Sequence, residues 1–104
     1  MEVYFKDKKM ERAVKNERLL LRTYGAVRGR LLMRRLDDIR FAGSFADLKL
    51  LPGHYHELTG NRHGQWACDL DQPYRLILEP VGERGDWKDI KIVDIIEIVN
   101  YHGK

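Results

Sequence analysis

The sequence predicts an α+β fold, in which a hairpin of two helices packs on a small antiparallel sheet. Two observations lead to this prediction. Apolar residues follow the helical period up to about residue 50, and beyond that point they alternate as they do along strands. The 104 residues have the length of one domain and contain no linker-like stretch, so we expect a single domain over residues 1–104.

The first half of the chain is expected to contain one short strand and then the two helices. Residues 3–5 are apolar and aromatic, as in a strand, and Asp7 is a suitable N-cap for a helix that reaches residue 24. Gly25 ends that helix, and the next one runs from about residue 26 to residue 41. Because the break is so short, the two helices are expected to run antiparallel.

The second half is expected to form an antiparallel β-meander. Strands are predicted at residues 55–58, 65–70, 74–80 and 90–99, with turns at 59–64 and 71–73, where glycine or proline stands. Trp66, Cys68 and Leu70 alternate on one face of their strand, which predicts that they pack in the core. The last strand is the richest in Ile and Val, so we predict that it is the central one.

The charges are unevenly distributed along the chain. The net charge of +3 combines residues 1–49, with 13 Lys and Arg against 7 Asp and Glu, and residues 50–104, with 6 against 9. Much of the positive charge lies on the predicted outer face of the second helix, at Arg28, Arg30, Arg34, Arg35 and Arg40. Such a face is typical of a surface that docks on RNA or an acidic partner, and an ordinary solvated face is the alternative.

Several classes of protein are excluded or disfavoured. No apolar stretch is long enough to span a bilayer, and the N-terminus turns polar at Lys6, unlike a signal peptide. Cys68 is the single cysteine, so a disulfide framework is excluded and a reducing compartment fits best. We therefore expect a cytoplasmic protein that does not associate with membranes.

All the histidines lie in the second half of the chain, at His54, His56, His63 and His102. His54 and His56 share a face of their strand, and His102 reaches His56 if the last strand pairs near the first strand of the meander. Two imidazoles beside Arg62 and Arg75 suit cleavage of RNA. One group takes the proton of the ribose 2′-hydroxyl, another protonates the departing 5′-oxygen, and an arginine stabilises the charged phosphorane.

This chemistry needs neither a metal nor a cofactor, because the RNA supplies its own nucleophile. Two other interpretations of the histidines stay open. His54 and His63 suit solvated loop positions, as histidines on loops usually do. The alternative interpretation is a zinc site formed by His54, His56, His63 and Cys68, which their irregular spacing and the single thiol disfavour.

Three stretches of the sequence resemble, in the same order, motifs of the HigB toxins. Residues 51–66 read LPGHYHELTGNRHGQW, which resembles the family's His-x-Leu-x-Gly-(Asp/Asn)-Arg-x-Gly-(Gln/Tyr)-aromatic stretch. Residues 71–77, DQPYRLI, resemble its aromatic-Arg-(Ile/Leu) strand, and residues 96–102, IEIVNYH, resemble its ending Ile-x-(Asp/Asn)-Tyr-His. HigB toxins are plasmid-maintenance system killer proteins of the RelE/ParE superfamily, so the resemblance implies a RelE-like arrangement of the predicted elements.

The resemblance implies the toxin of a type II toxin–antitoxin system. Such a toxin is an mRNA interferase, an endoribonuclease that enters the ribosomal A site, cuts the codon there and inhibits translation. By resemblance, the catalytic residues are His56, Tyr101 and His102, with proton transfer shared by the histidines. The residues that contact the substrate or its phosphate are Arg62, Arg75 and Asn100. Those that dock on ribosomal RNA are Arg28, Arg30, Arg34 and Arg35.

The implied partners are the ribosome with its mRNA and a helix-turn-helix antitoxin of the HigA type. The toxin would contact operator DNA only through this antitoxin.

Two positions depart from the family pattern. Asn100 stands where an acidic residue is common, and Thr59 stands where a lysine is common. An amide orients a substrate but does not act as a base. These departures leave two alternatives, a catalytically weak antitoxin-binding module and a ParE-like toxin that poisons gyrase. The Tyr101–His102 ending argues against the second.

Overall fold

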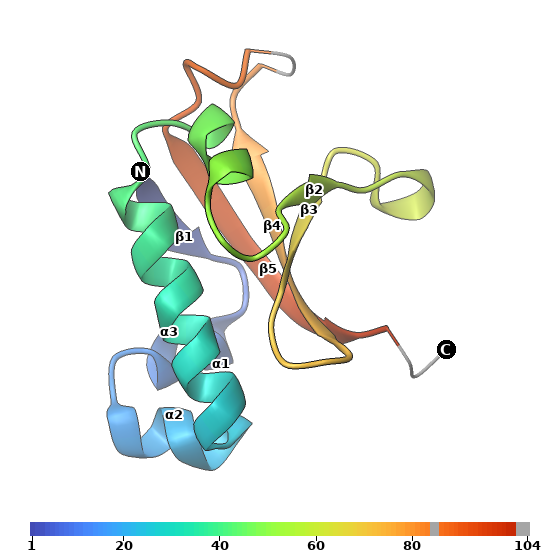
Figure 1. Ribbon diagram of the computed structural model, residues 1–104. Coiled ribbons are helices and arrows are strands. Elements are labelled where there is room, and N and C mark those ends of the chain that lie inside the picture. Colours follow the sequence, from blue (N-terminus) through green and yellow to red (C-terminus); the bar gives the residue numbers. More distant parts are fainter. Residues whose placement is uncertain (84–85, 102–104) are drawn as a thin grey trace.

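A five-stranded sheet forms one layer of the molecule, and three helices cover one face of it (Figure 1). The computed structural model describes residues 1–83 and 86–101. Its helices are α1 (Lys8–Ala13), α2 (Glu17–Tyr24) and α3 (Ala26–Phe41), with two short 3₁₀ helices, η1 (Phe45–Leu50) and η2 (Gly60–Arg62). Its strands are β1 (Glu2–Phe5), β2 (His56–Glu57), β3 (Trp66–Asp69), β4 (Tyr74–Val81) and β5 (Ile92–Asn100). The predicted α+β fold is confirmed.

The strands are arranged in the order β1-β5-β4-β3-β2. β2 to β5 form the predicted antiparallel meander, and β1 adds to the free side of β5 in parallel. The prediction that β5 is the central strand is therefore wrong, because β4 holds that place. The Ile- and Val-rich composition of β5 still has a physical reason, since β5 is an interior strand with a neighbour on each side.

The prediction of one continuous helix over residues 8–24 is also wrong, because the chain breaks between α1 and α2. Asp7 caps α1 as predicted, with its side chain accepting a hydrogen bond from the Met10 N–H. Asn16 does the same for α2, where its side chain accepts from the Leu19 N–H at 3.2 Å. A short polar side chain that caps a new helix competes with continuing the old one.

The Asn16 cap gives a first testable expectation. Replacing Asn16 by alanine is expected to lower the free energy of unfolding by about 1 kcal/mol, because the Leu19 N–H then loses its acceptor in the protein. Urea denaturation measures this loss. Asn16→Asp is the matched control, since a carboxylate also caps a helix, and it should unfold like the wild type. Equal losses in both variants would contradict a capping role.

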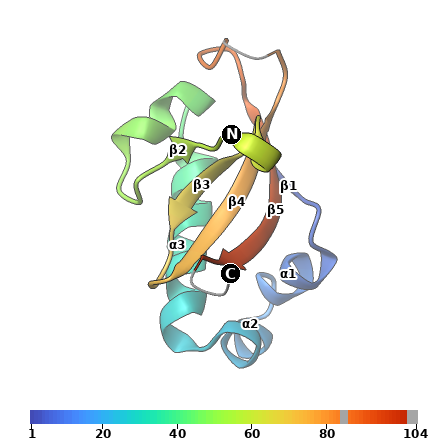
Figure 2. The same cartoon turned by 90° about the vertical axis from the view of Figure 1, so that its right-hand side faces the viewer.

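The core lies between the helices and the sheet. On the sheet side, Trp66 and Cys68 of β3 lie opposite Leu78 and Leu76 of β4, and all four are buried. Helix α3 contributes the buried Leu32, Leu36 and Ile39. The opposite face of the sheet, toward the viewer in Figure 2, carries no α-helix from the part of the chain that is described, and the short η2 lies over one end of it. Within that part, no helix has both the length and the apolar character needed to cross a membrane.

Candidate active site

The face of the sheet that the helices leave open gathers most of the polar side chains of interest. Cross-strand partners point to the same side of a sheet. Since Cys68 and Leu76 point into the core, the neighbouring pair Asp69 and Arg75 points to the open face. His56 lies opposite Ala67, two residues before Asp69, and so shares that face. We call this surface the open face.

His54 and His56 lie against each other at the edge of the open face. Their rings are stacked, with centroids 4.5 Å apart and planes 25° apart. His56 Nδ1 lies 2.9 Å from the carbonyl oxygen of His54. Since a carbonyl only accepts, Nδ1 of His56 carries the hydrogen and Nε2 is left to accept a proton. His54 has a φ of 55°, and among the described residues it is the only one other than glycine with a positive φ.

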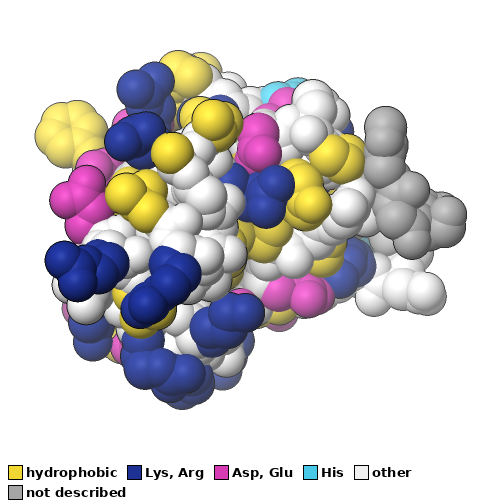
Figure 3. All heavy atoms as spheres, turned by 90° about the horizontal axis from the view of Figure 1, so that it is seen from below, with side chains coloured by type: hydrophobic (Ala, Val, Ile, Leu, Met, Phe, Trp, Pro, Cys, Tyr) yellow, Lys and Arg dark blue, Asp and Glu magenta, His cyan; other side chains and the backbone are white. Residues whose placement is uncertain are grey.

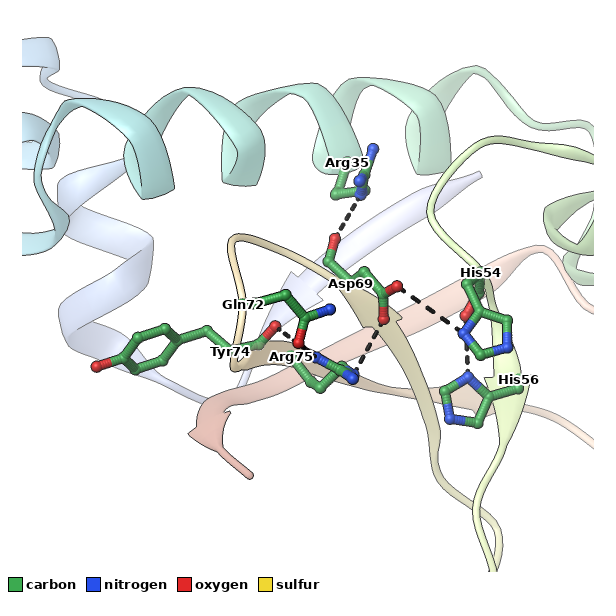
Figure 4. A network of polar contacts seen from close by, with 7 residues as sticks. All are labelled: Arg35, His54, His56, Asp69, Gln72, Tyr74 and Arg75. Atoms are coloured by element: carbon green, nitrogen blue, oxygen red, sulfur yellow. Dashed lines mark hydrogen bonds and ion pairs between the residues drawn. The ribbon is translucent and has the colours of Figure 1, made fainter. Parts of the chain in front are cut away.

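Asp69 joins the histidines to Arg75 (Figure 4). One carboxylate oxygen of Asp69 lies 3.0 Å from Arg75 Nε, and the other lies 3.9 Å from His54 Nδ1. The backbone of Asp69 is held on both sides. Its N–H donates to the Gly53 carbonyl at 2.8 Å, and its carbonyl accepts from Arg35 Nε at 2.7 Å. The backbone of Asp69 is therefore fixed, and its carboxylate lies between an imidazole and a guanidinium.

Tyr101 extends the same series of contacts to the end of β5. The guanidinium of Arg75 lies 5.3 Å from the centre of the Tyr101 ring, within range of a cation–π contact. The Tyr101 N–H donates to the Pro73 carbonyl at 3.2 Å, which ties the chain after β5 to the β3–β4 turn. Asn100 pairs with Tyr74, and this register places it on the helical side of the sheet, away from Arg75. His102 lies outside the described residues.

The pairing that would bring the end of β5 close to His56 does not form. β5 is separated from β2 by β4 and β3, so the two ends of the site are connected through Arg75, Asp69 and His54. Arg62, also predicted to contact phosphate, donates to Glu97 of β5 at 2.7 Å and to Gln65 at 2.9 Å. Arg62 therefore ties the η2 turn to the sheet.

The prediction that Arg28 and Arg35 lie on the exposed face of α3 is wrong. Arg28 forms a two-bond ion pair with Asp71, at 3.0 and 3.1 Å, and its guanidinium lies 3.4 Å from the centre of the Tyr74 ring. Arg35 is buried, with 9% of its surface exposed, and bonds the Asp69 carbonyl. Both side chains fasten α3 to the sheet, and neither is displayed for docking.

Arg30 and Arg34 are exposed, as predicted. They lie at a groove of about 560 Å³ between α2 and α3, with apolar walls that include Leu21 and Met33. Viewed from below, the helical end of the molecule carries many of the Lys and Arg side chains in sight (Figure 3). The exposed cations of α1 to α3 and their connections are Lys8, Lys9, Arg12, Lys15, Arg18, Arg22, Arg30, Arg34 and Arg40.

Cys68 is a structural residue. Its side chain is buried on the core face of β3, and burial raises the pKa of its thiol to about 12. Burial likewise raises the pKa of the neighbouring Tyr55 hydroxyl. Neither group therefore ionises near neutral pH, and neither serves as a nucleophile there. Within residues 1–83 and 86–101, no three His, Cys, Asp or Glu side chains gather to hold a metal ion.

Sequence reasoning missed the part played by Asp69. It placed His54 on one strand face with His56 and otherwise interpreted it as a solvated residue or as one of a zinc set, whereas His54 lies before β2. A signal was present for Asp69. Since Trp66, Cys68 and Leu70 were expected to point inward, the residues between them had to point to the other face. No comparable signal existed for the backbone of His54, whose left-handed conformation depends on the loop around it.

The sequence matches no protein-family model and no curated protein. Among solved structures, the chain is similar to a YoeB/ParE toxin from Agrobacterium tumefaciens, with a TM-score of 0.47 and 15% sequence identity. The match covers 94% of this chain and 96% of that one.

Proposed function

We propose that this protein is the toxin of a type II toxin–antitoxin system and that it cuts mRNA on the ribosome. The main support is the series of contacts on the open face, which connects His56, Arg75 and Tyr101 through Asp69 and His54. These three residues fall in the three sequence stretches that resemble HigB toxins. An imidazole, a guanidinium and a phenol on one face suit phosphodiester cleavage without a metal.

In this proposal, each group has a defined task. His56 takes the proton from the ribose 2′-hydroxyl through Nε2, and the 2′-oxygen attacks the adjacent phosphorus. Arg75 stabilises the charge on the phosphorane, and Tyr101 orients the nucleotide beside it. Arg75 uses Nε for Asp69, and its terminal nitrogen contacts Gln72 and the Tyr74 carbonyl at 3.5 and 3.3 Å, so donors remain for a phosphate. The resemblance names His102 as the second residue in proton transfer, and His102 lies outside the described residues.

A second candidate function is a binding module with weak or no catalysis. One observation favours it: both arginines expected to contact phosphate already face carboxylates. Arg62 is paired with Glu97, and Arg75 is paired with Asp69. A phosphate would have to compete with these acids. Such a protein would bind its antitoxin tightly and leave mRNA intact.

The proposed partners are the ribosome, its mRNA and a helix-turn-helix antitoxin. For the ribosome, the exposed Arg30 and Arg34 are the expected contacts on α3. A plot of the logarithm of the binding constant against the logarithm of the salt concentration has a negative slope. Replacing both arginines by alanine should make this slope less steep by about 1.4 to 1.8. Salt-dependent binding to purified ribosomes measures this slope. The double variant Lys88→Ala, Lys91→Ala removes equal charge from the other half and should leave the slope unchanged.

Expression in bacteria tests the function itself. The wild-type protein is expected to arrest growth, with mRNA cut at codons in translated regions and naked mRNA left whole in a purified assay. Gyrase-linked DNA breaks with intact mRNA would instead indicate a ParE-like toxin. Normal growth together with tight binding to an antitoxin would indicate the binding module.

A further inference from the structure

We infer that His54 is the general acid of the proposed cleavage, and that Asp69 is the residue that positions it. The inference rests on the proposed function and assigns the proton donor of that same site. It is carried by the stacked His54–His56 pair and by the carboxylate next to it.

The first step of the inference concerns His56, which cannot take both roles. The His54 carbonyl accepts the Nδ1 hydrogen of His56 at 2.9 Å, so His56 has a single free nitrogen, Nε2, for proton transfer. A residue fixed in this form suits the general base. The departing 5′-oxygen then needs a proton from a second group. Of the described histidines, His54 is the one whose ring lies against His56.

The second step concerns the charge around His54. Asp69 places a carboxylate oxygen 3.9 Å from His54 Nδ1, so a negative charge faces the ring that would donate the proton. Arg35 and Gly53 hold the backbone of Asp69, and Arg75 Nε holds its carboxylate at 3.0 Å. His54 itself is 70% exposed at the side chain, so an RNA strand on the open face can reach it.

The third step concerns the backbone. A non-glycine residue with φ of 55° is uncommon, and such conformations gather at functional sites. The preceding Gly53 allows the loop to pass Arg35. A Cβ on Gly53 would lie 2.9 Å from Arg35 Nε, so the loop packs directly on the side chain that holds Asp69. His54 and Asp69 are thus positioned by the same arginine.

The reaction balances with these two histidines. His56 Nε2 takes the proton of the 2′-hydroxyl as the 2′-oxygen bonds to phosphorus. The bond from phosphorus to the 5′-oxygen breaks, and that oxygen takes a proton from the His54 imidazolium. The products are a 2′,3′-cyclic phosphate and a 5′-hydroxyl. Afterwards His56 is protonated and His54 is neutral, and exchange with water restores both.

The test uses His54→Asn, because asparagine tolerates a positive φ and does not transfer protons. On ribosomes programmed with ordinary mRNA, this variant should cut at least about 100-fold more slowly than the wild type. In the second substrate, sulfur replaces the 5′-oxygen at the mapped cut site. A thiolate is a good leaving group and needs no proton, so this substrate does not need a general acid. On this substrate, the variant should cut within about threefold of the wild-type rate. His56→Ala should stay slow on both substrates.

Two further readouts separate an acid from a merely structural residue. The groups that face His54 are His56 from β2 and Asp69 from β3, with Arg75 of β4 behind Asp69. Loss of a general acid should remove the decline of the cleavage rate at high pH, whereas a structural defect would lower the rate at every pH. Asp69→Asn should slow cleavage of ordinary mRNA. The sulfur substrate should restore the part of the rate that is lost through His54, but not a part lost through Arg75, with which Asp69 is also paired.

The inference would be overturned if His54→Asn cut ordinary mRNA at the wild-type rate, or if sulfur failed to rescue it. It would also be overturned if sulfur rescued His102→Ala and not His54→Asn, since His102 would then be the acid. These outcomes all require a wild-type protein that cuts. A wild-type protein that leaves programmed mRNA intact contradicts the proposed function itself.

Discussion

Replacing His56 by alanine is expected to lower the rate of mRNA cleavage on the ribosome by about 10²–10⁴-fold, the usual effect of losing a general base. His56 is the imidazole whose proton-accepting nitrogen is fixed by a hydrogen bond, at 2.9 Å, from its other nitrogen to the His54 carbonyl. Its partner across the sheet is Ala67, so the change leaves the core face of β3 untouched. Single-turnover cleavage of programmed mRNA gives the rate.

The matched control is His63→Ala, which removes an exposed histidine from the same half of the chain. His63→Ala should cut mRNA at the wild-type rate. Both variants should have the same midpoint of urea denaturation as the wild type. If His56→Ala cut within about threefold of the wild type while remaining folded, His56 would not be the base. If His63→Ala were equally slow, the effect would not be specific to the stacked pair.

Replacing Trp66 by alanine is expected to lower the free energy of unfolding by about 3–5 kcal/mol, a large part of the stability of a small domain. Trp66 is 2% exposed and packs edge-to-face on Phe45 at 5.1 Å and on Trp87 at 5.5 Å. Alanine would leave a cavity where β3, η1 and the chain before β5 meet. Urea denaturation followed by circular dichroism measures the loss.

Trp66→Phe is the control that separates volume from hydrogen bonding. Among the described residues, Trp66 Nε1 has no hydrogen-bond partner, so phenylalanine gives up no bond there. The phenylalanine ring would still fill much of the space, and this variant should lose less than half as much stability as the alanine variant. Equal losses from the two variants would contradict a role based on packed volume.

Local signals in the sequence were enough for most of the fold. The predicted second helix matches α3 at Ala26–Phe41, because Gly25 precedes it and apolar residues recur along it. The end of α1 was missed because apolar residues keep the helical period across Asn16. The sequence alone does not show whether Asn16 lies inside a helix or caps a new one. The place of β5 was missed because strand order depends on where β1 pairs, which is a contact between residues about 90 positions apart.

The candidate site was predicted in part. The positions of Arg28 and Arg35 were not, and the reasons differ between the two levels of structure involved, the helix and its packing on the sheet. Arg35 was assigned to the outer face of its helix, although it lies three residues after Leu32 and four before Ile39, a spacing that fits the buried stripe. Its acceptor, the Asp69 carbonyl, lies 34 residues away, and the partner of Arg28 lies 43 residues away. Pairings of that range follow from the packing of α3 on the sheet and cannot be read from periodicity.

The chemistry of the cut ends tests the central claim most directly. Wild-type protein is added to ribosomes programmed with a short mRNA, and the fragments are analysed by mass spectrometry. Attack by the ribose 2′-hydroxyl gives an upstream fragment that ends in a 2′,3′-cyclic phosphate or its hydrolysed 3′-phosphate, and a downstream fragment that begins with a 5′-hydroxyl. A 3′-hydroxyl paired with a 5′-phosphate, or mRNA that stays whole, would contradict the proposed mechanism.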